Sequence, residues 1–250
     1  MNEISLQKYY NQKARDFDEL ALTYNNKSRY KRFFYKTRFN KVVKALAFKK
    51  GEKILDLGCG SGYYVKYLVD KGAEAYGIDL SGEYIKQAKS YVSSDRANFK
   101  IASAINVPFR NEYFDKVLMT EVIEHVPNNK KALKEVRRVL KTGGSAVITT
   151  INRNSYMNIA YGLKRIVRGY KFNEHVTEFS RHEFLSLLAK YFKIDEIFMC
   201  NFIMPYPLDN YFIRNFSAKA EKVFKKVENF MSISYFLKAL GWTMIVKVSK

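Results

Sequence analysis

Three glycines at alternate positions, Gly58, Gly60 and Gly62, follow the apolar run at residues 54–57 of this 250-residue chain. The run is typical of a short buried strand, and helical spacing of apolar residues begins at Tyr63. A strand that turns through glycine into a helix lets a ligand approach the backbone closely and directs backbone N–H groups at it. The sequence therefore predicts a ligand-binding turn here.

Two acidic residues narrow the choice of ligand. The dinucleotide fingerprint G-x-G-x-x-G would need a glycine at position 63, which is Tyr63. Asp56, just before the first glycine, would repel a pyrophosphate but would suit an ammonium group. Asp79 ends the next apolar run, where a carboxylate can accept hydrogen bonds from ribose hydroxyls. An amino acid joined to a nucleoside meets both demands, and S-adenosylmethionine is such a molecule.

Alternating strands and helices must position these residues. Apolar runs predict strands at 54–57, 75–78, 99–101, 114–119, 146–151, 193–202 and 244–248, with helical patterns at 5–24, 61–71, 129–140 and 180–191. Ser81 is expected to cap a further helix, and residues 141–144 to form a turn. Such alternation predicts an α/β fold, in which a parallel sheet has helices on both faces and binds ligands at the carboxyl ends of its strands.

The composition limits the class of protein. An apolar fraction of 47% is enough for a hydrophobic core, and the length suits one domain. The first ten residues are polar, and no stretch approaches the roughly 20 apolar residues of a membrane span, so we expect no transmembrane segment. Two cysteines, Cys59 and Cys200, do not make a disulfide framework, which predicts a reducing, cytoplasmic setting.

The net charge of +20 favours a polyanionic partner, either nucleic acid or an anionic membrane surface. A basic surface suited to a particular cell interior is the alternative. Residues 27–53 hold eleven Lys or Arg and one acid, and their apolar residues recur at helical spacing. The segments 155–170 and 217–231 repeat this basic amphipathic pattern. The first of them is typical of a helix lying on a membrane, or of a lid over an active site.

Four segments resemble the class I S-adenosylmethionine-dependent methyltransferases, in the family's order. They are ILDLGCGSG at 54–62, YGIDLS at 76–81, VPFRNEYFDKVLMTEVIEHV at 107–126 and LKTGGSAVITT at 140–150. The resemblance implies a Rossmann-like, mostly parallel sheet of seven strands whose last strand is antiparallel. We expect N-terminal helices and a helical insertion after the fifth strand in addition.

The predicted organisation is a single methyltransferase domain over residues 1–250. It divides into an N-terminal helical cap at 1–50, a cofactor-binding core at 51–151, a helical substrate or lid insertion at 152–192, and C-terminal strands with a basic helix at 193–250.

A narrower resemblance is to the O-methyltransferases of ubiquinone biosynthesis. The run at 149–154 and His175, which leads into Phe179 and a helix, carry it. That group methylates phenolic hydroxyls on rings that bear polyprenyl tails. In that group, a cofactor-contacting arginine stands at the spacing that Arg38 has from Asp56, and a further cofactor contact stands at Thr120.

The resemblance implies a set of cofactor contacts, in which the glycine turn meets the methionine moiety and Asp79 the ribose. The predicted set is Arg38, Asp56, Gly58, Cys59, Gly60, Asp79, Leu80, Ser103, Ala104, Thr120 and Glu121. Many relatives carry an acidic residue in the loop after the third strand, where it contacts the adenine amino group. Ser103 takes that position here.

The cluster Glu121, Glu124 and His125 allows three interpretations. Two carboxylates and an imidazole could hold Mg²⁺ against a catechol-like oxygen. Alternatively, His125 is the general base, with Glu124 beside it as a second catalytic candidate. In the third interpretation, Glu121 contacts cofactor and His125 fixes the loop.

Aromatic residues near the N-terminus are the last candidates. Tyr9, Tyr10, Phe17 and Tyr24 could form an aromatic lid over a sulfonium, or could simply pack.

The sequence thus predicts a methyltransferase that uses S-adenosylmethionine to O-methylate a small or lipid-like, quinone-type acceptor at a membrane surface, with Mg²⁺ as a second candidate cofactor. A tRNA or rRNA methyltransferase that grips phosphates with residues 27–53 is one alternative. A non-catalytic cofactor-binding or membrane-interaction protein is another.

Overall fold

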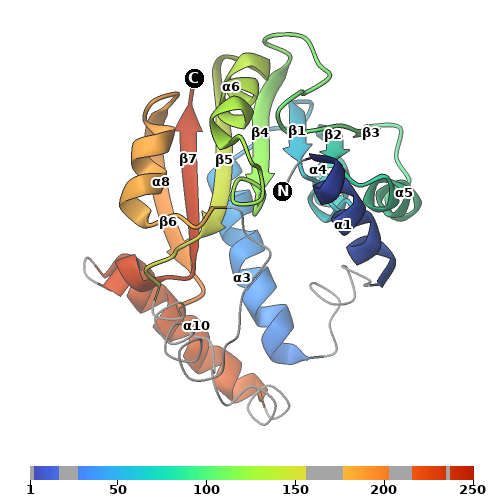
Figure 1. The fold of residues 1–250 in the computed structure, drawn as a ribbon. Coiled ribbons are helices and arrows are strands. Elements are labelled where there is room, and N and C mark those ends of the chain that lie inside the picture. The colour runs from blue at the N-terminus through green and yellow to red at the C-terminus, as the bar shows by residue number, and fades with distance from the viewer. Residues whose placement is uncertain (1–2, 17–27, 156–176, 203–215, 235–236) are drawn as a thin grey trace.

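The computed structural model describes residues 3–16, 28–155, 177–202, 216–234 and 237–250. Its central sheet has seven strands in the order β3-β2-β1-β4-β5-β7-β6 (Figure 1). Strands β1 to β5 run parallel to one another, and β7 lies antiparallel between β5 and β6. The predicted Rossmann-like sheet with an antiparallel last strand is confirmed.

The elements follow the sequence pattern closely. The strands are β1 Lys53–Leu57, β2 Glu74–Asp79, β3 Ala97–Ile101, β4 Phe114–Thr120, β5 Leu140–Ile151, β6 Lys193–Cys200 and β7 Thr243–Ser249. The helices are α1 Glu3–Asp16, α3 Arg29–Leu46, α4 Tyr63–Asp70, α5 Gly82–Tyr91, α6 Asn129–Val139, α8 Arg181–Leu188 and α10 Ala218–Ile233, with a 3₁₀ turn at Leu237–Leu240. Ser81 caps α5 as predicted, by accepting a hydrogen bond from the Tyr84 backbone N–H.

The prediction of a turn at residues 141–144, before a strand that begins at 146, is wrong. These residues belong to β5, whose Leu140 pairs with Phe114 before the register shifts. Gly143, at φ 77°, supplies the irregularity that the pattern suggested. The expected helix at 155–170 and the end of the one at 5–24 lie outside the described residues, whereas the predicted helix at 217–231 is confirmed as α10.

Successive strand residues face opposite sides of the sheet, so each face has its own core. Helices α3, α4 and α5 pack on one face, where Leu118 and Val147 are fully buried. Helices α6 and α8 cover the other face, which buries Val117 and Ile148. Near-continuous apolar strands are typical of a parallel sheet buried on both sides.

One carboxylate lies deep in this structure, behind the carboxyl end of β4. Glu124 is 1% exposed, and its Oε2 accepts a hydrogen bond from the Thr150 hydroxyl at 3.0 Å. Burial, together with the nearby charge of Glu121, raises the pKa of Glu124 well above its ordinary value. The side chain therefore ties the turn after β4 to the end of β5.

Replacing Glu124 by Gln keeps the shape of this side chain and removes its titration. The pKa of Glu124 in the folded protein is raised above its ordinary value of 4.5. The stability that the protonated carboxyl contributes is therefore lost as the pH rises from about 4.5 through the pKa of the folded state. Between about pH 5 and about pH 8, we expect the free energy of unfolding of Glu124→Gln to increase relative to that of wild type, by about 1.4 kcal/mol per unit of pKa shift. Urea unfolding curves at both pH values measure this.

Glu196→Gln is the matched control, because the Glu196 side chain is about half exposed on β6 and pairs with Lys247 on the surface. A difference between Glu124→Gln and wild type that stays constant with pH would contradict the assignment.

Candidate cofactor and acceptor site

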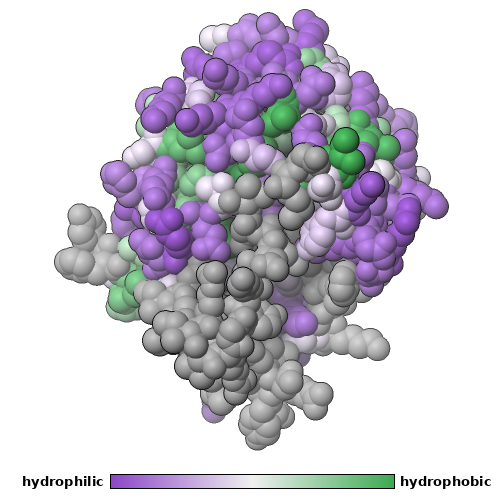
Figure 2. All heavy atoms as spheres, in the orientation of Figure 1, coloured by the Kyte–Doolittle hydropathy of each residue, from purple (hydrophilic) through white to green (hydrophobic). Residues whose placement is uncertain are grey.

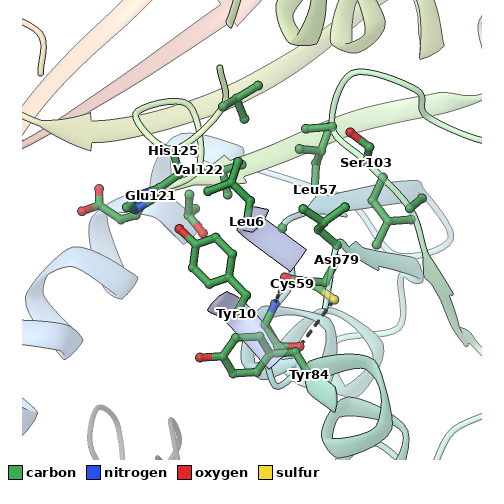
Figure 3. Close-up of a pocket in the computed structure, with 18 of the residues that line it drawn as sticks. Leu6, Tyr10, Leu57, Cys59, Asp79, Tyr84, Ser103, Glu121, Val122 and His125 are labelled. Carbon is green, nitrogen blue, oxygen red and sulfur yellow. Dashed lines mark hydrogen bonds between the residues drawn. The ribbon is translucent and has the colours of Figure 1, made fainter. Parts of the chain in front are cut away.

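A cavity of about 550 Å³ opens at the carboxyl ends of β1, β2 and β4. Strands β2 and β3 extend the sheet on one side of β1, and the chain then crosses over to β4, which lies on the other side of β1. Parallel sheets bind ligands at such a switch point because the two crossovers leave a crevice between them. Helix α1 lies over this crevice (Figures 1 and 3).

The glycine turn after β1 forms the floor of the cavity. Gly58 has φ 80°, and a Cβ at this position would lie 2.3 Å from Cγ2 of Val122. The N–H groups of Gly58 and Cys59 donate to the Ile78 carbonyl, so they are not directed at a ligand as the sequence suggested. The turn therefore offers close approach to the backbone rather than a set of donors.

Asp79 ends β2 beside this turn. Its Oδ2 accepts a hydrogen bond from the Gly60 N–H at 3.0 Å, and its Oδ1 accepts one from the Ser81 N–H at 2.8 Å. These two bonds fix the carboxylate plane at the cavity wall. A carboxylate has about four acceptor positions, so it retains acceptor capacity for hydroxyl groups.

The opposite wall carries an ion pair. Arg38 of α3 lies with Nη1 3.3 Å from Oε2 of Glu121, and both side chains line the cavity. Glu121 has φ 54°, which is unusual for a residue other than glycine. Thr149 holds it there, because its hydroxyl donates to Oε1 of Glu121 and accepts from the Glu121 N–H.

The cavity brings together most of the residues predicted from the sequence. Those that line it are Arg38, Gly58, Cys59, Gly60, Asp79, Leu80, Ser103, Ala104, Thr120, Glu121 and His125. Asp56 and Glu124 are absent from the lining. Asp56 is buried at 1% exposure, and alternation along β1 directs Leu57 into the cavity and Asp56 to the other face. The charged residues that do line the cavity are Glu3, Lys13, Arg38, Asp79 and Glu121.

The hypothesis of a metal site at Glu121, Glu124 and His125 is not supported by the arrangement of these side chains. Glu124 binds Thr150 away from the cavity, and Glu121 pairs with Arg38. Within the described segments, no three His, Cys, Asp or Glu side chains are grouped so that they could hold a metal ion. The E-x-x-E-H spacing lies on a turn, which separates side chains that a helix would bring together.

His125 reaches the cavity by a different route from Glu124. Its backbone N–H donates to the Val122 carbonyl, which closes the turn after β4. The ring lies 5.9 Å from the ring of Tyr10, edge to face. Figure 3 shows Glu121 and His125 on one side of the cavity and Ser103 on the other, with Leu6 and Tyr10 between them. Of the aromatic lid candidates, Tyr10 lines the cavity, and Phe17 and Tyr24 lie outside the described residues.

Sequence reasoning missed most of the contribution of α1. Glu3, Leu6 and Lys13 line the cavity beside Tyr10. These residues recur at intervals of three and four, which places them on one helical face. That periodicity was a signal for a helix, but it did not tell which surface the helix covers.

The residues present fit S-adenosylmethionine. The close approach at Gly58, the fixed acceptor Asp79 and the opposite charges of Arg38 and Glu121 match the needs of a nucleoside joined to an amino acid.

Comparison with known proteins agrees with this geometry. Residues 55–148 match the sequence profile of the family described as "Methyltransferase domain". The chloroplastic tocopherol O-methyltransferase of Arabidopsis thaliana is 38% identical over 118 residues, which are 45% of this chain and 34% of that protein. The ubiquinone biosynthesis O-methyltransferase of Nitrosomonas europaea is 31% identical over 136 residues, which are 52% of this chain and 58% of the relative. The chain thus spans between about a third and three-fifths of these relatives.

Among solved structures, a possible histamine N-methyltransferase of Thermotoga maritima, described as dependent on S-adenosylmethionine, has a TM-score of 0.66 at 20% identity. The similarity covers 98% of this chain and 99% of that chain, and it concerns the fold. Together, the sheet order, the methyltransferase domain matched over residues 55–148 and the relatives show that this chain resembles the class I S-adenosylmethionine-dependent methyltransferases, and that its sequence is similar to the ubiquinone-biosynthesis O-methyltransferases.

Proposed function

We propose that this chain transfers a methyl group from S-adenosylmethionine to an oxygen of a small or lipid-like, quinone-type acceptor at a membrane surface. The observation that carries the proposal is the cavity at the switch point, which has a fixed carboxylate at Asp79 and a charge pair, Arg38 and Glu121, across from it.

Each part of the cofactor has a candidate partner in this cavity. Asp79 would hold the ribose hydroxyls, because a carboxylate accepts hydrogen bonds and donates none. Arg38 would bind the carboxylate of the methionine moiety and Glu121 its ammonium group, in the charge-assisted bonds that are strongest in partly buried sites. When bound, S-adenosylmethionine supplies an electrophilic methyl group on a sulfonium, which is already a good leaving group.

The protein then has two further tasks. Helix α1 lies over the cavity, where it would shield an acceptor oxygen held close to the cofactor from water. His125 lies on the same side of the cavity as Glu121, which supports a role for its imidazole as the acceptor of the proton from the acceptor hydroxyl. A phenolic hydroxyl needs this help near neutral pH because its ordinary pKa is about 10.

The acceptor class is supported by the relatives and by the lining of the cavity. Both relatives are named O-methyltransferases, one for tocopherol and one in ubiquinone biosynthesis, and these compounds are rings with long apolar tails. The rings of Tyr10, Tyr35 and Tyr63 line the cavity, and aromatic rings pack well on one another.

Helix α10 supports the membrane part of the proposal. Its apolar residues Val223, Phe230 and Ile233 are 52%, 62% and 81% exposed. Its exposed lysines are Lys219, Lys222, Lys225 and Lys226. A helix with apolar and basic residues exposed together suits an anionic membrane interface. On the face drawn in Figure 2, the described part of the surface is mostly hydrophilic, with only small hydrophobic patches. No described helix is long and apolar enough to span a bilayer.

Asp79→Ala tests the cofactor assignment. Removing the carboxylate takes away the acceptors for the ribose and releases the Gly60 and Ser81 N–H groups. We expect the Kd for S-adenosylmethionine, measured by isothermal titration calorimetry, to rise at least about tenfold. Asp95→Ala, in an exposed loop position, is the control and should bind as wild type does. Equal affinity of Asp79→Ala and wild type would sink the assignment.

His125→Gln tests the proton acceptor. With a prenylated catechol as acceptor and S-adenosylhomocysteine as the measured product, we expect kcat to fall about 100-fold while the Kd for the cofactor is kept. The deficit should shrink at alkaline pH, where the phenol ionises without help. His182→Gln, at an exposed position on α8, is the matched control. A deficit that is independent of pH would point to a positioning role for His125.

Phe230→Ser combined with Ile233→Ser tests the membrane surface. Each side chain contributes about 1.5–3 kcal/mol when it is buried in an apolar phase, so flotation with anionic vesicles should weaken at least tenfold. Ile197→Ser removes an exposed apolar residue from β6 and should float as wild type does. If wild-type protein does not bind anionic vesicles but binds tRNA tightly at physiological salt, the result would favour the hypothesis of an RNA methyltransferase instead.

A further inference from the structure

The side of the cavity across from His125 contains a carboxylate from the start of α1. Glu3 and Ser103 both line the cavity there, and the Ser103 hydroxyl donates a hydrogen bond to Oε1 of Glu3. Ser103 follows β3, in the loop where many class I relatives carry an acidic residue. This loop has a serine at that position, and the carboxylate beside it comes from Glu3 of α1, 100 residues away in sequence.

Two neighbouring strands set the position of Ser103, the hydrogen-bond partner of Glu3, relative to Asp79. Asp79 and Ile101 are paired at the ends of β2 and β3, and the Ala102 N–H donates to the Asp79 carbonyl at 2.9 Å. Ser103 is the next residue along. A ring attached to a ribose held by Asp79 therefore has the Glu3 and Ser103 wall beside it.

Polar contacts along α1 fix the helix that carries Glu3. The Gln7 side-chain amide donates to the Leu80 carbonyl at 3.0 Å, and the Gln87 amide donates to the Ala14 carbonyl at 2.7 Å. Asn11 accepts a hydrogen bond from the Ser81 hydroxyl at 2.8 Å. Because these bonds run along the helix, the carboxylate is held at one place in the cavity wall.

We propose that Glu3 recognises the exocyclic amino group of the cofactor's adenine and so determines specificity for an amino-bearing base. A carboxylate only accepts hydrogen bonds, so it favours a ring edge with an N–H donor and repels one with a carbonyl oxygen. Ser103 occupies one acceptor position of Glu3 and leaves others for the ligand. This inference rests on the proposed function, because it assumes that the ribose and base of S-adenosylmethionine bind here.

The test compares two ligands by isothermal titration calorimetry. One is S-adenosylhomocysteine, and the other is its inosine counterpart, in which a carbonyl oxygen replaces the amino group. We expect wild type to prefer the adenine ligand by about tenfold or more, as a charge-assisted hydrogen bond implies. Glu3→Gln should bring the two affinities close together, because the glutamine amide can donate to the carbonyl. Restoring a carboxylate with Ser103→Asp in the Glu3→Gln background should recover the preference.

The ratio of the two affinities separates recognition from a merely structural role. If Glu3 only anchors α1, Glu3→Gln weakens both ligands equally and the ratio stays at the wild-type value, which would overturn the inference. Asp16→Asn, an exposed acid on the same helix, should leave both affinities unchanged. Failure of wild type to bind S-adenosylhomocysteine at all would instead overturn the proposed function.

Discussion

The Asp79 carboxylate joins the turns that follow β1 and β2. It accepts hydrogen bonds from the N–H groups of Gly60 and Ser81, one in each turn. This closeness requires the turn after β1 to fold back over β2, which the positive φ and missing side chain of Gly58 permit. The two turns that form the floor of the cavity are therefore tied together through Asp79.

The wall across from Asp79 has a conformational cost. Glu121 adopts a left-handed backbone conformation, which costs about 1–3 kcal/mol for such residues. Thr149 offsets part of this cost with two hydrogen bonds, and the buried Glu124 below holds the same turn against β5 through Thr150. With this backbone conformation the Glu121 carboxylate pairs with Arg38 in the cavity wall.

Helix α1 is held differently from these walls. It buries only Leu6 and Ala14, and its other contacts with the core are largely hydrogen bonds and an exposed ion pair from Arg15 to Glu83. Helix α1 is therefore held at the cavity mainly by directional polar contacts, whereas β1, β2 and β4 are held by strand pairing within the sheet.

The sequence by itself determined what depends on short-range pattern. It predicted the strands, the glycine turn, the position of Asp79 at a strand end and the resemblance to methyltransferases that use S-adenosylmethionine. Periodicity, turn chemistry and short motifs are local properties of the chain. Only the tertiary structure decided which way the buried carboxylates face: Asp56 and Glu124, both expected in the site, lie outside the cavity lining. It also brought Glu3 to Ser103, since a contact across 100 residues depends on how a helix docks on the sheet and leaves no local pattern.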